Sequence, residues 1–254
     1  MNIQGKTVLI TGGASGIGFE AAKQFLKNGA KVIITGRNQD KLDAAKQQFP
    51  ELIALKSDVS KAEDANALFE KVSGFGGIDI LFNNAGVGVP PINLAVANDK
   101  HLAGAVYEMD VNYFGVIRLN NLFMDMLQSR REAAIINTTS ILSIVPSVLE
   151  ATYSASKAAL AFYTKSLRSH LQAIQSSVKV FELLPPLVDT DMVADRPDKK
   201  ISPEKLVNSL IKGLQNDTYT IRVGDTKALY FLNRLMPETA YKMVNKKEHY
   251  NHLK

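Results

Sequence analysis

The chain has 254 residues, of which 46% are hydrophobic, a length and composition that suit one α/β domain with a large core. The absence of cysteine excludes disulfides, thiolate catalysis and cysteine-ligated metals. No apolar run reaches the roughly 18 residues of a membrane span. We therefore expect a cytoplasmic protein without a membrane span, and no metal site, because the four histidines lack a paired metal-ligand spacing.

The net charge of +5 is concentrated near the end of the chain. Residues 227–254 contain six Lys or Arg against two acidic residues. Such a tail is compatible with nucleic acid or anionic lipid, but it lacks the basic-aromatic interleaving of a single-strand binder and any zinc-finger spacing. We favour a solvated terminal helix and predict no nucleic-acid partner.

Apolar runs of strand length alternate with helical stretches, a pattern typical of a parallel sheet covered on both faces. Seven strands are expected, over residues 7–11, 31–35, 52–56, 78–82, 133–137, 178–181 and 219–223. About six helices are expected, including residues 17–27, 40–48 (capped by Asp40), 62–72, one that ends near Arg130 and one that carries Tyr153. We predict an α/β fold, a doubly wound parallel sheet in a single domain of residues 1–254, with a core of about 5–223 and a helical tail over 224–254.

A glycine-rich turn joins the first strand to the first helix, in the order Thr11-Gly12-Gly13-Ala14-Ser15-Gly16-Ile17-Gly18. Glycines let the backbone approach a pyrophosphate closely, and a helix N-terminus offers free N–H groups. The spacing Gly12-x-x-x-Gly16-x-Gly18 is preferred to the literal G-x-G-x-x-A match that starts at Gly16. The turn predicts a Rossmann-type dinucleotide site, with contacts from Gly12, Ser15, Gly16, Ile17 and Gly18.

The end of the second strand distinguishes NAD from NADP. An acidic residue there binds the ribose 2′-hydroxyl of NAD, whereas arginine favours the 2′-phosphate of NADP. The chain has Gly36 and then Arg37 at this position, with no carboxylate. We therefore predict NADP(H), with Arg37 as mere surface charge as the alternative.

A possible acid/base pair follows the fifth strand, where Ser140 precedes Tyr153 by thirteen residues and Lys157 follows Tyr153 by four. Residues four apart on a helix share a face, so the lysine charge could lower the pKa of the tyrosine from its usual value of about 10. An isolated Tyr-x-x-x-Lys is a weak signal, because such pairs occur by chance on many helices. Together with a dinucleotide turn, it indicates carbonyl or alcohol redox chemistry.

These motifs, with Asn83-Asn84-Ala85-Gly86 and a proline-rich turn after the sixth strand, resemble the short-chain dehydrogenases/reductases, in the branch of about 250 residues. The resemblance implies that Tyr153 is the acid/base, that Lys157 holds the nicotinamide ribose and lowers the tyrosine pKa, and that Ser140 binds the substrate oxygen. It also implies a proton-relay role for Asn112, for which a helix-kink asparagine is the alternative. Ser143 is a competitor to Ser140, at a spacing the family does not use.

The same resemblance assigns further cofactor contacts. It places Asp58 and Val59 at the adenine, and Asn84, Ala85 and Gly86 on the adenosine side, where the asparagine could instead tie adjacent strands together. Val188 and Thr190 would hold the nicotinamide edge. Pro186 replaces the glycine that is common after the sixth strand, which fixes φ and removes an N–H.

The function expected from these features is NADP(H)-dependent reduction of a ketone or aldehyde to an alcohol, or the reverse, by a homodimer or homotetramer. The alternatives are reduction of 3-oxoacyl thioesters on an acyl carrier protein, and a non-catalytic NADP(H)-binding sensor. Apolar loops near the chemistry favour a neutral, moderately hydrophobic carbonyl compound, whereas Glu150 could attract a cation or face solvent. A polar segment, 189–200, is expected to close over the site as a lid.

Overall fold

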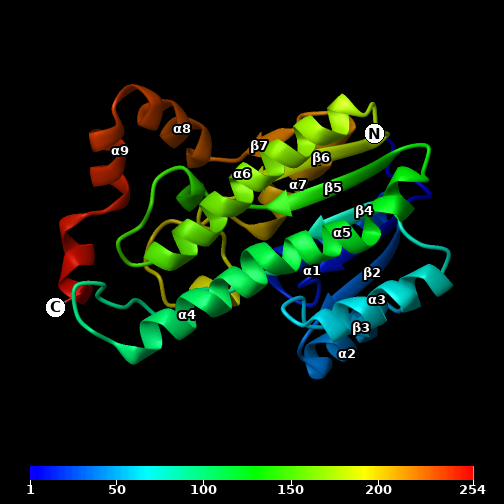
Figure 1. Cartoon of the computed structure of the whole chain (residues 1–254), viewed down its shortest axis with the longest axis horizontal. Coiled ribbons are helices and arrows are strands. Elements are labelled where there is room, and N and C mark those ends of the chain that lie inside the picture. Colours follow the sequence, from blue (N-terminus) through cyan, green and yellow to red (C-terminus); the bar gives the residue numbers. More distant parts are fainter. Residues whose placement is uncertain (254) are drawn as a thin grey trace.

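The computed structural model describes residues 1–253, which form a single seven-stranded sheet in the order β3-β2-β1-β4-β5-β6-β7 (Figure 1). The strands are β1 (Thr7–Thr11), β2 (Lys31–Gly36), β3 (Ile53–Lys56), β4 (Ile80–Asn83), β5 (Ala133–Thr138), β6 (Val178–Leu184) and β7 (Thr220–Arg222). Every pair of neighbouring strands is parallel. The predicted fold class is confirmed, and the strand order reverses between β1 and β4, where such sheets bind ligands.

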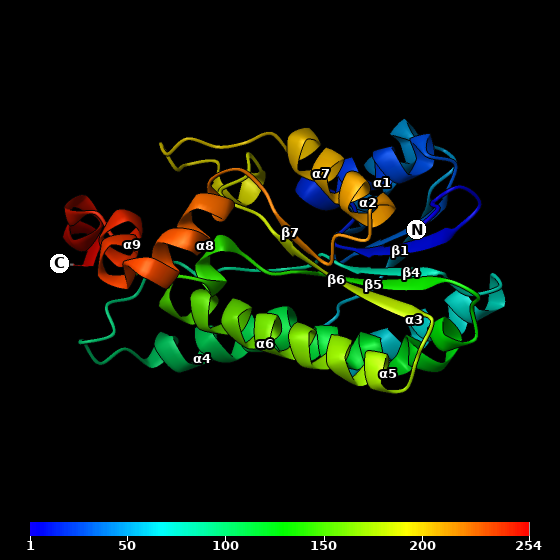
Figure 2. The same ribbon diagram turned by 90° about the horizontal axis from the view of Figure 1, so that it is seen from above.

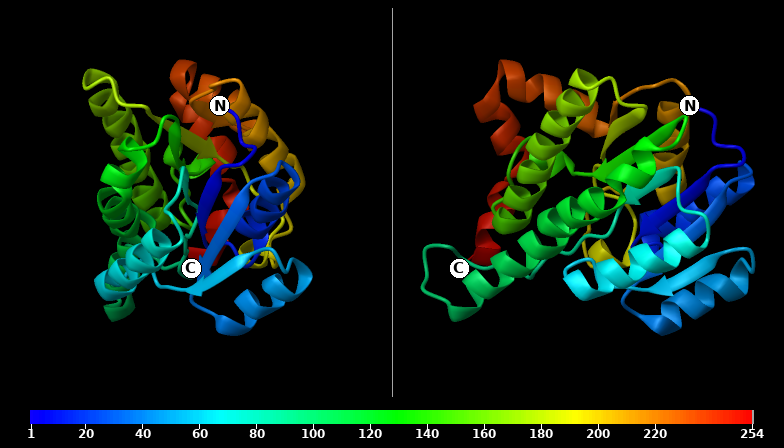
Figure 3. Two further views of the ribbon diagram at one scale, coloured as in Figure 1. Left: turned by 90° about the vertical axis from the view of Figure 1, so that its right-hand side faces the viewer. Right: turned by 45° about the vertical axis from the view of Figure 1, so that its right-hand side comes forward.

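Helices cover both faces of the sheet (Figures 2 and 3). The helices are α1 (Gly16–Lys27), α2 (Gln39–Gln48), α3 (Ala62–Gly74), α4 (Asp99–Met109), α5 (Gly115–Gln128), α6 (Ala151–Ala173), α7 (Pro203–Gln215), α8 (Asp225–Leu235) and α9 (Pro237–Val244). Four short segments are a π-helical turn, η1 (Asp110–Phe114), and 3₁₀ turns, η2 (Ile141–Ser143), η3 (Asp191–Val193) and η4 (Lys247–Leu253). Helices α1, α2 and α7 cover one face, and α3 to α6 cover the other (Figure 2).

Two details of the helices differ from the sequence prediction. The helix expected to end near Arg130 is α4 and α5 joined through the π-helical turn η1. Asp40 does not cap the second helix: α2 begins at Gln39, so Asn38 is the N-cap, and its side chain accepts from the Lys41 N–H at 3.0 Å. Asp40 lies in the first turn, where its charge favours the positive end of the helix dipole.

Burial of the sheet on both faces explains its uninterrupted apolar strands. One cluster packs Phe25 of α1 and Phe181 of β6 with side chains of α2 and α7. The other packs Phe123 of α5 with side chains of α3 and α6. Among the described residues, no helix is both long enough and apolar enough to cross a membrane.

The C-terminal helices lie beyond the carboxyl ends of the strands, against the loop before α6 (Figures 1 and 2). Leu229 of α8 and Ala240 of α9 bury Val145 of that loop. The Asn245 side chain donates to the Pro146 carbonyl at 2.9 Å and accepts from the Val148 N–H at 2.7 Å. The tail therefore packs within the chain, while its last residue, Lys254, lies outside the described residues.

Candidate active site

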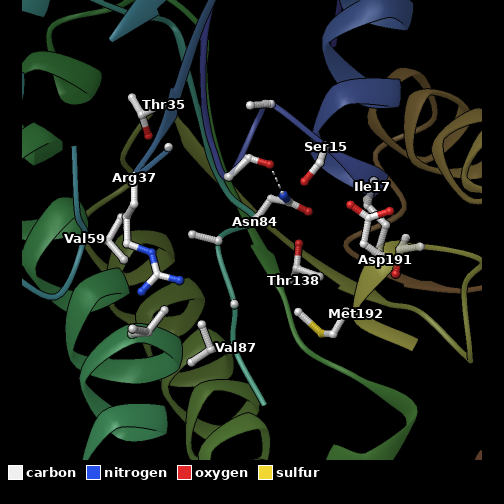
Figure 4. A pocket seen from close by; sticks show the side chains of 18 of the residues that line it. Ser15, Ile17, Thr35, Arg37, Val59, Asn84, Val87, Thr138, Asp191 and Met192 are labelled. Carbon is white, nitrogen blue, oxygen red and sulfur yellow. Dashed lines mark hydrogen bonds between the residues drawn. The ribbon is translucent and has the colours of Figure 1, made fainter. Parts of the chain in front are cut away.

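A cavity of about 750 Å³ opens at the carboxyl ends of the central strands, at the switch point between β1 and β4 (Figure 4). Thirteen of the residues predicted from the sequence line it: Gly12, Ser15, Gly16, Ile17, Arg37, Asp58, Val59, Asn84, Ala85, Gly86, Tyr153, Lys157 and Thr190. The other predicted residues, Gly18, Asn112, Ser140 and Val188, are buried and are not among the lining residues. The structure thus brings segments from almost the whole sheet to one site.

The glycine turn needs glycine for two different reasons. Gly12 and Gly16 have φ values of +63° and +53°, in the left-handed region that favours glycine. Gly18 instead allows close packing, because a Cβ there would lie 2.2 Å from the Gly12 carbonyl oxygen and 2.6 Å from Asn84 Nδ2. These positions let the backbone fold tightly at the start of α1.

The N-terminus of α1 is open to the cavity. Ser15 is its N-cap residue, and the side chain makes no capping hydrogen bond. Asn84 braces the turn from β4, since its Nδ2 donates to the Thr11 carbonyl at 3.0 Å and to the Gly12 carbonyl at 3.2 Å. Asn84 therefore both ties neighbouring strands together and lines the cavity. Free N–H groups at a rigid helix start suit a phosphate.

Arg37 places a positive charge at the cavity wall where β2 ends. Arg37 follows β2, points into the cavity (Figure 4), hydrogen-bonds the Tyr107 hydroxyl and lies over that ring, 5.7 Å from its centroid. Lys41 also lines the cavity and pairs with Asp191 at 3.0 Å. Asp40 is absent from the lining, so no carboxylate of the β2–α2 connection faces this end.

The turn after β3 supplies the next part of the lining. Asp58 Oδ1 accepts from the Ser60 N–H at 3.0 Å and from the Ser60 hydroxyl at 2.7 Å, which fixes the carboxyl group. Val59 is 7% exposed, and its carbonyl accepts from Arg118 at 2.6 Å. Both residues are held at the cavity wall by contacts within and beyond the turn.

Ser140 is positioned by the backbone around it. The N–H groups of Thr139 and Ile141 donate to the Leu183 and Pro185 carbonyls, each at 2.9 Å, so the pairing of β5 with β6 continues past the strand end. The Ser140 hydroxyl accepts from the Leu142 N–H at 3.1 Å and is a hydrogen-bond partner of Tyr153. Ser143 instead donates to the Ser140 carbonyl at 2.6 Å and is thereby turned to the backbone.

The pKa of Tyr153 is raised above its ordinary value of 10, opposite to the direction expected from Lys157 alone. Burial is the largest cause, and the Glu150 and Glu108 carboxylates act in the same direction. The Ser140 hydrogen bond and the Arg196 charge lower it. Burial and two carboxylates favour the neutral phenol, so Tyr153 is protonated at neutral pH.

Lys157 is 3% exposed, and burial lowers its pKa from 10.5 to about 8. Its Nζ donates to the Thr138 carbonyl at 2.9 Å and lies 5.7 Å from the centroid of the Tyr153 ring. Lys157 and Tyr153 therefore lie close to each other, as their helical spacing predicts. The lysine loses its proton more easily than an exposed lysine would.

Asn112 lies in the π-helical turn η1 and is fully buried. Its Oδ1 accepts from the Val87 N–H at 2.9 Å, and its Nδ2 donates to the Val87 carbonyl at 2.9 Å and to the Ser156 hydroxyl at 3.0 Å. A Cβ added to Gly86 would lie 3.4 Å from both Asn112 Oδ1 and Lys157 Nζ. Asn112 therefore holds the Val87 backbone from within the π-helical turn.

Sequence reasoning missed several lining residues, including Thr35, Thr138, Asp191 and Met192. The hydroxyls of Thr35 and Thr138 are buried and lack a hydrogen-bond partner among the residues described. Both threonines stand at or next to strand ends, which is the signal that could have found them. Unpaired polar atoms in a cavity wall suit a polar ligand.

Comparison with known proteins places the chain in a family. The family model described as short chain dehydrogenase matches residues 6–201. The uncharacterized oxidoreductase DltE of Bacillus subtilis is 32% identical over 255 residues, which cover 98% of this chain and all of DltE. The chain belongs to the short-chain dehydrogenase family and is an oxidoreductase.

Solved structures show the same fold. A short chain dehydrogenase from Burkholderia cenocepacia, in complex with NADP, has a TM-score of 0.84 at 27% identity, over 96% of this chain and 99% of its own. The 3-ketoacyl-(acyl-carrier-protein) reductase from Brucella melitensis, complexed with NADH, has a TM-score of 0.76 at 28% identity, over 83% of this chain and 91% of its own.

Proposed function

We propose that the protein is an NADP(H)-dependent oxidoreductase that reduces a ketone or aldehyde to an alcohol, or catalyses the reverse, with Tyr153 as acid/base. The observation that carries the proposal is the position of Tyr153 and Lys157, with Ser140 beside them, in the same cavity as the open N-terminus of α1. A phosphate-binding helix start and a proton donor at opposite parts of one cavity suit hydride transfer.

The cavity wall fits a nicotinamide dinucleotide. Its open helix start and tight glycine turn would hold the pyrophosphate, Asp58 and Val59 the adenine, and residues 84–86 the adenosine side. Lys157 would hold the nicotinamide ribose, and Val188 and Thr190 would flank the nicotinamide; Val188 is buried and joins Ile201 in a β-bridge. When bound, the cofactor supplies the hydride.

The protein's own groups supply the proton and the electrostatics. Tyr153 donates its proton to the developing alkoxide, and the Ser140 hydroxyl donates a hydrogen bond to the same oxygen. Reduction needs a protonated phenol, which the raised pKa of Tyr153 provides. Lys157 returns a proton to the tyrosine, with Asn112 fixing the backbone beside it.

Tyr153→Phe tests this chemistry, because it removes one hydroxyl and keeps the ring. Turnover should fall by orders of magnitude on a panel of aldehydes, ketones and keto-esters with NADPH, while the dissociation constant of NADPH changes little. Tyr163→Phe is the matched control, because Tyr163 lies on the same helix and its hydroxyl accepts from the Asn120 side chain at 3.4 Å. Full activity in Tyr153→Phe would refute the proposal.

The proposed preference for NADP(H) rests on Arg37, which follows β2 and lines the cavity. Arg37→Met should weaken NADPH binding by about 10- to 100-fold and leave NADH binding almost unchanged, since a charged hydrogen bond contributes about 1.5 to 3 kcal/mol. Arg131→Met, at an exposed position outside the cavity, is the control. Tighter binding of NADH than of NADPH to the unaltered protein would contradict the assignment.

Two alternatives remain distinguishable by experiment. The resemblance to the Brucella reductase supports acyl-carrier-protein thioesters as substrates, and a higher rate with a carrier-bound substrate than with a simple keto-ester would favour it. A non-catalytic sensor would bind NADPH without turnover of any compound in the panel, although Ser140, Tyr153, Lys157 and Asn112 are all present.

A homodimer or homotetramer is the assembly we propose. Large apolar side chains stand exposed on the outer helices, among them Leu102 (73%), Phe114 (46%) and Phe162 (72%). Exposed apolar groups on neighbouring helices are typical of an interface. Light scattering on the purified protein measures the mass directly.

A further inference from the structure

The segment after β6 forms a closed loop that lines the cavity through Thr190, Asp191 and Met192. Residues 187–201, called the lid below, leave and return at the same place: the Asp189 N–H donates to the Ile201 carbonyl at 2.9 Å, and the Ile201 N–H donates to the Leu187 carbonyl at 3.0 Å. Asp191 and Met192 of the lid line the cavity opposite Arg37 (Figure 4). The base of the lid is therefore fixed by backbone bonds.

Three ion pairs attach the lid to other elements. Lys41–Asp191 (3.0 Å) and Lys246–Asp198 (3.4 Å) join side chains that are all more than 40% exposed. Arg196–Glu150 is shorter, at 2.7 Å, and its side chains are only 31% and 20% exposed. Exposed pairs contribute little to stability, so the Arg196–Glu150 pair is the strongest of these three attachments.

Glu150 lies where its charge affects the pKa of Tyr153. It is the N-cap residue of α6, three residues before Tyr153, and its carboxylate raises the pKa of the tyrosine while Arg196 lowers it. The second carboxylate, Glu108 of α4, is held in place by the Val89 N–H at 2.9 Å.

The remaining polar neighbours of the phenol are fixed. Ser140 is held by the backbone after β5, and Lys157 stands on α6 itself. Among the described groups that shift the pKa of Tyr153, Arg196 is the one that comes from the lid, so movement of the lid changes the charge beside the phenol.

We propose that the Glu150–Arg196 ion pair is a clasp. When the lid closes, the Arg196 guanidinium pairs with Glu150 and compensates the negative charge beside Tyr153, so that the phenol gives up its proton more readily. Arg196 is a positioning residue, since its ion pair with Glu150 is what holds its charge near Tyr153. The inference rests on the proposed role of Tyr153. It couples closure of the lid to the acidity of the Tyr153 phenol.

The clasp predicts a non-additive pattern. Arg196→Met leaves Glu150 charged and alone, so the pKa of Tyr153 should rise by roughly 0.5 to 1 unit, the effect of one nearby charge at an effective dielectric of about 20 or more. Glu150→Gln removes the carboxylate and also releases Arg196. Adding Arg196→Met to Glu150→Gln should therefore shift the pKa of Tyr153 no further.

The ionisation of Tyr153 can be measured without turnover. Protein labelled with 3,5-difluorotyrosine, whose phenol ionises at lower pH than tyrosine, is titrated by ¹⁹F NMR, and the Tyr153 signal is assigned by its absence from Tyr153→Phe. The four proteins are the parent, Arg196→Met, Glu150→Gln and the double variant. Because no substrate is used, the result stands apart from any failure of Tyr153→Phe to lose activity.

Two controls separate the clasp from general loosening of the lid. Lys246→Met breaks the exposed pair to Asp198 and should leave the Tyr153 titration unchanged. Arg196→Lys keeps a positive charge beside Glu150, so its Tyr153 titration should be close to that of the parent. Hydrogen exchange of residues 190–199 should become faster in Arg196→Met and Glu150→Gln than in Lys246→Met. Equal shifts by Arg196→Met with and without Glu150, no shift at all, or an equal shift in Lys246→Met would each overturn the clasp.

Discussion

Replacing Lys157 with methionine should stabilise the folded protein at neutral pH while removing activity. Burial lowers the pKa of Lys157 from 10.5 to about 8, which corresponds to a cost of about 3 kcal/mol for the charged form at pH 7. The side chain is 3% exposed, so solvent does not screen this cost. Loss of the charged hydrogen bond to the Thr138 carbonyl offsets about 1.5 to 3 kcal/mol of this cost. The expected net gain in unfolding free energy is therefore at most about 1.5 kcal/mol.

The gain should depend on pH in a defined direction. The folded pKa lies below the unfolded one, so between about pH 8 and pH 10.5 the unfolded state binds more protons and the stability of the parent protein rises. The cost of Lys157 is complete below pH 8 and disappears above pH 10.5. The parent and Lys157→Met should therefore become about equally stable near pH 9.

Urea unfolding at pH 7, 8, 9 and 10 measures the difference between the two proteins. Both carry Tyr153→Phe, so that the neighbouring phenol does not titrate. The reasoning is refuted if Lys157→Met is less stable than its parent at pH 7, or if the difference stays constant across this range.

Two further substitutions test the geometry that supports the site. Gly18→Ala would place a Cβ 2.2 Å from the Gly12 carbonyl oxygen, so it should lower the unfolding free energy by about 1 to 3 kcal/mol and weaken NADPH binding. Gly74→Ala is the control, because its Cβ would meet open space, and it should have neither effect. Equal effects of the two substitutions would contradict the packing argument. Asn112→Ala removes the side-chain partners of the Val87 N–H and carbonyl, so it should lower the unfolding free energy by about 2 to 3 kcal/mol and speed hydrogen exchange at Val87. Unchanged exchange at Val87 would show that the asparagine does not hold this segment.

Much of the fold follows from local pattern. Continuous apolar runs such as Ala133–Thr138 mark strands buried on both faces, and all seven strands form where such runs predict them. The π-helical turn at Asp110–Phe114 has no such pattern, because it depends on how the Asn112 side chain meets Val87, twenty-five residues away. The cap of α2 was misplaced because the choice between Asn38 and Asp40 depends on where the first turn begins.

The candidate site also has features that follow from local sequence and features that depend on distant segments. The glycine turn and the Tyr153–Lys157 spacing are local, and the structure brings them into one cavity. The environment of the phenol comes from distant segments: Glu108 from α4 and Arg196 from the lid. For that reason, the sequence predicts that Tyr153 and Lys157 lie close together, but it predicts the wrong direction for the tyrosine pKa shift.

The opposite shifts of Tyr153 and Lys157 have a consequence for the proposed chemistry. A phenolate that has given its proton to the substrate has a high proton affinity, because burial and the Glu150 and Glu108 carboxylates disfavour its charge. Lys157, with its pKa lowered to about 8, is a neighbour that gives up a proton readily. Proton return from lysine to tyrosine is therefore downhill after reduction, whereas oxidation must first remove the phenol proton against the same gradient. These two shifts therefore suit the proton donor that the proposed carbonyl reduction needs.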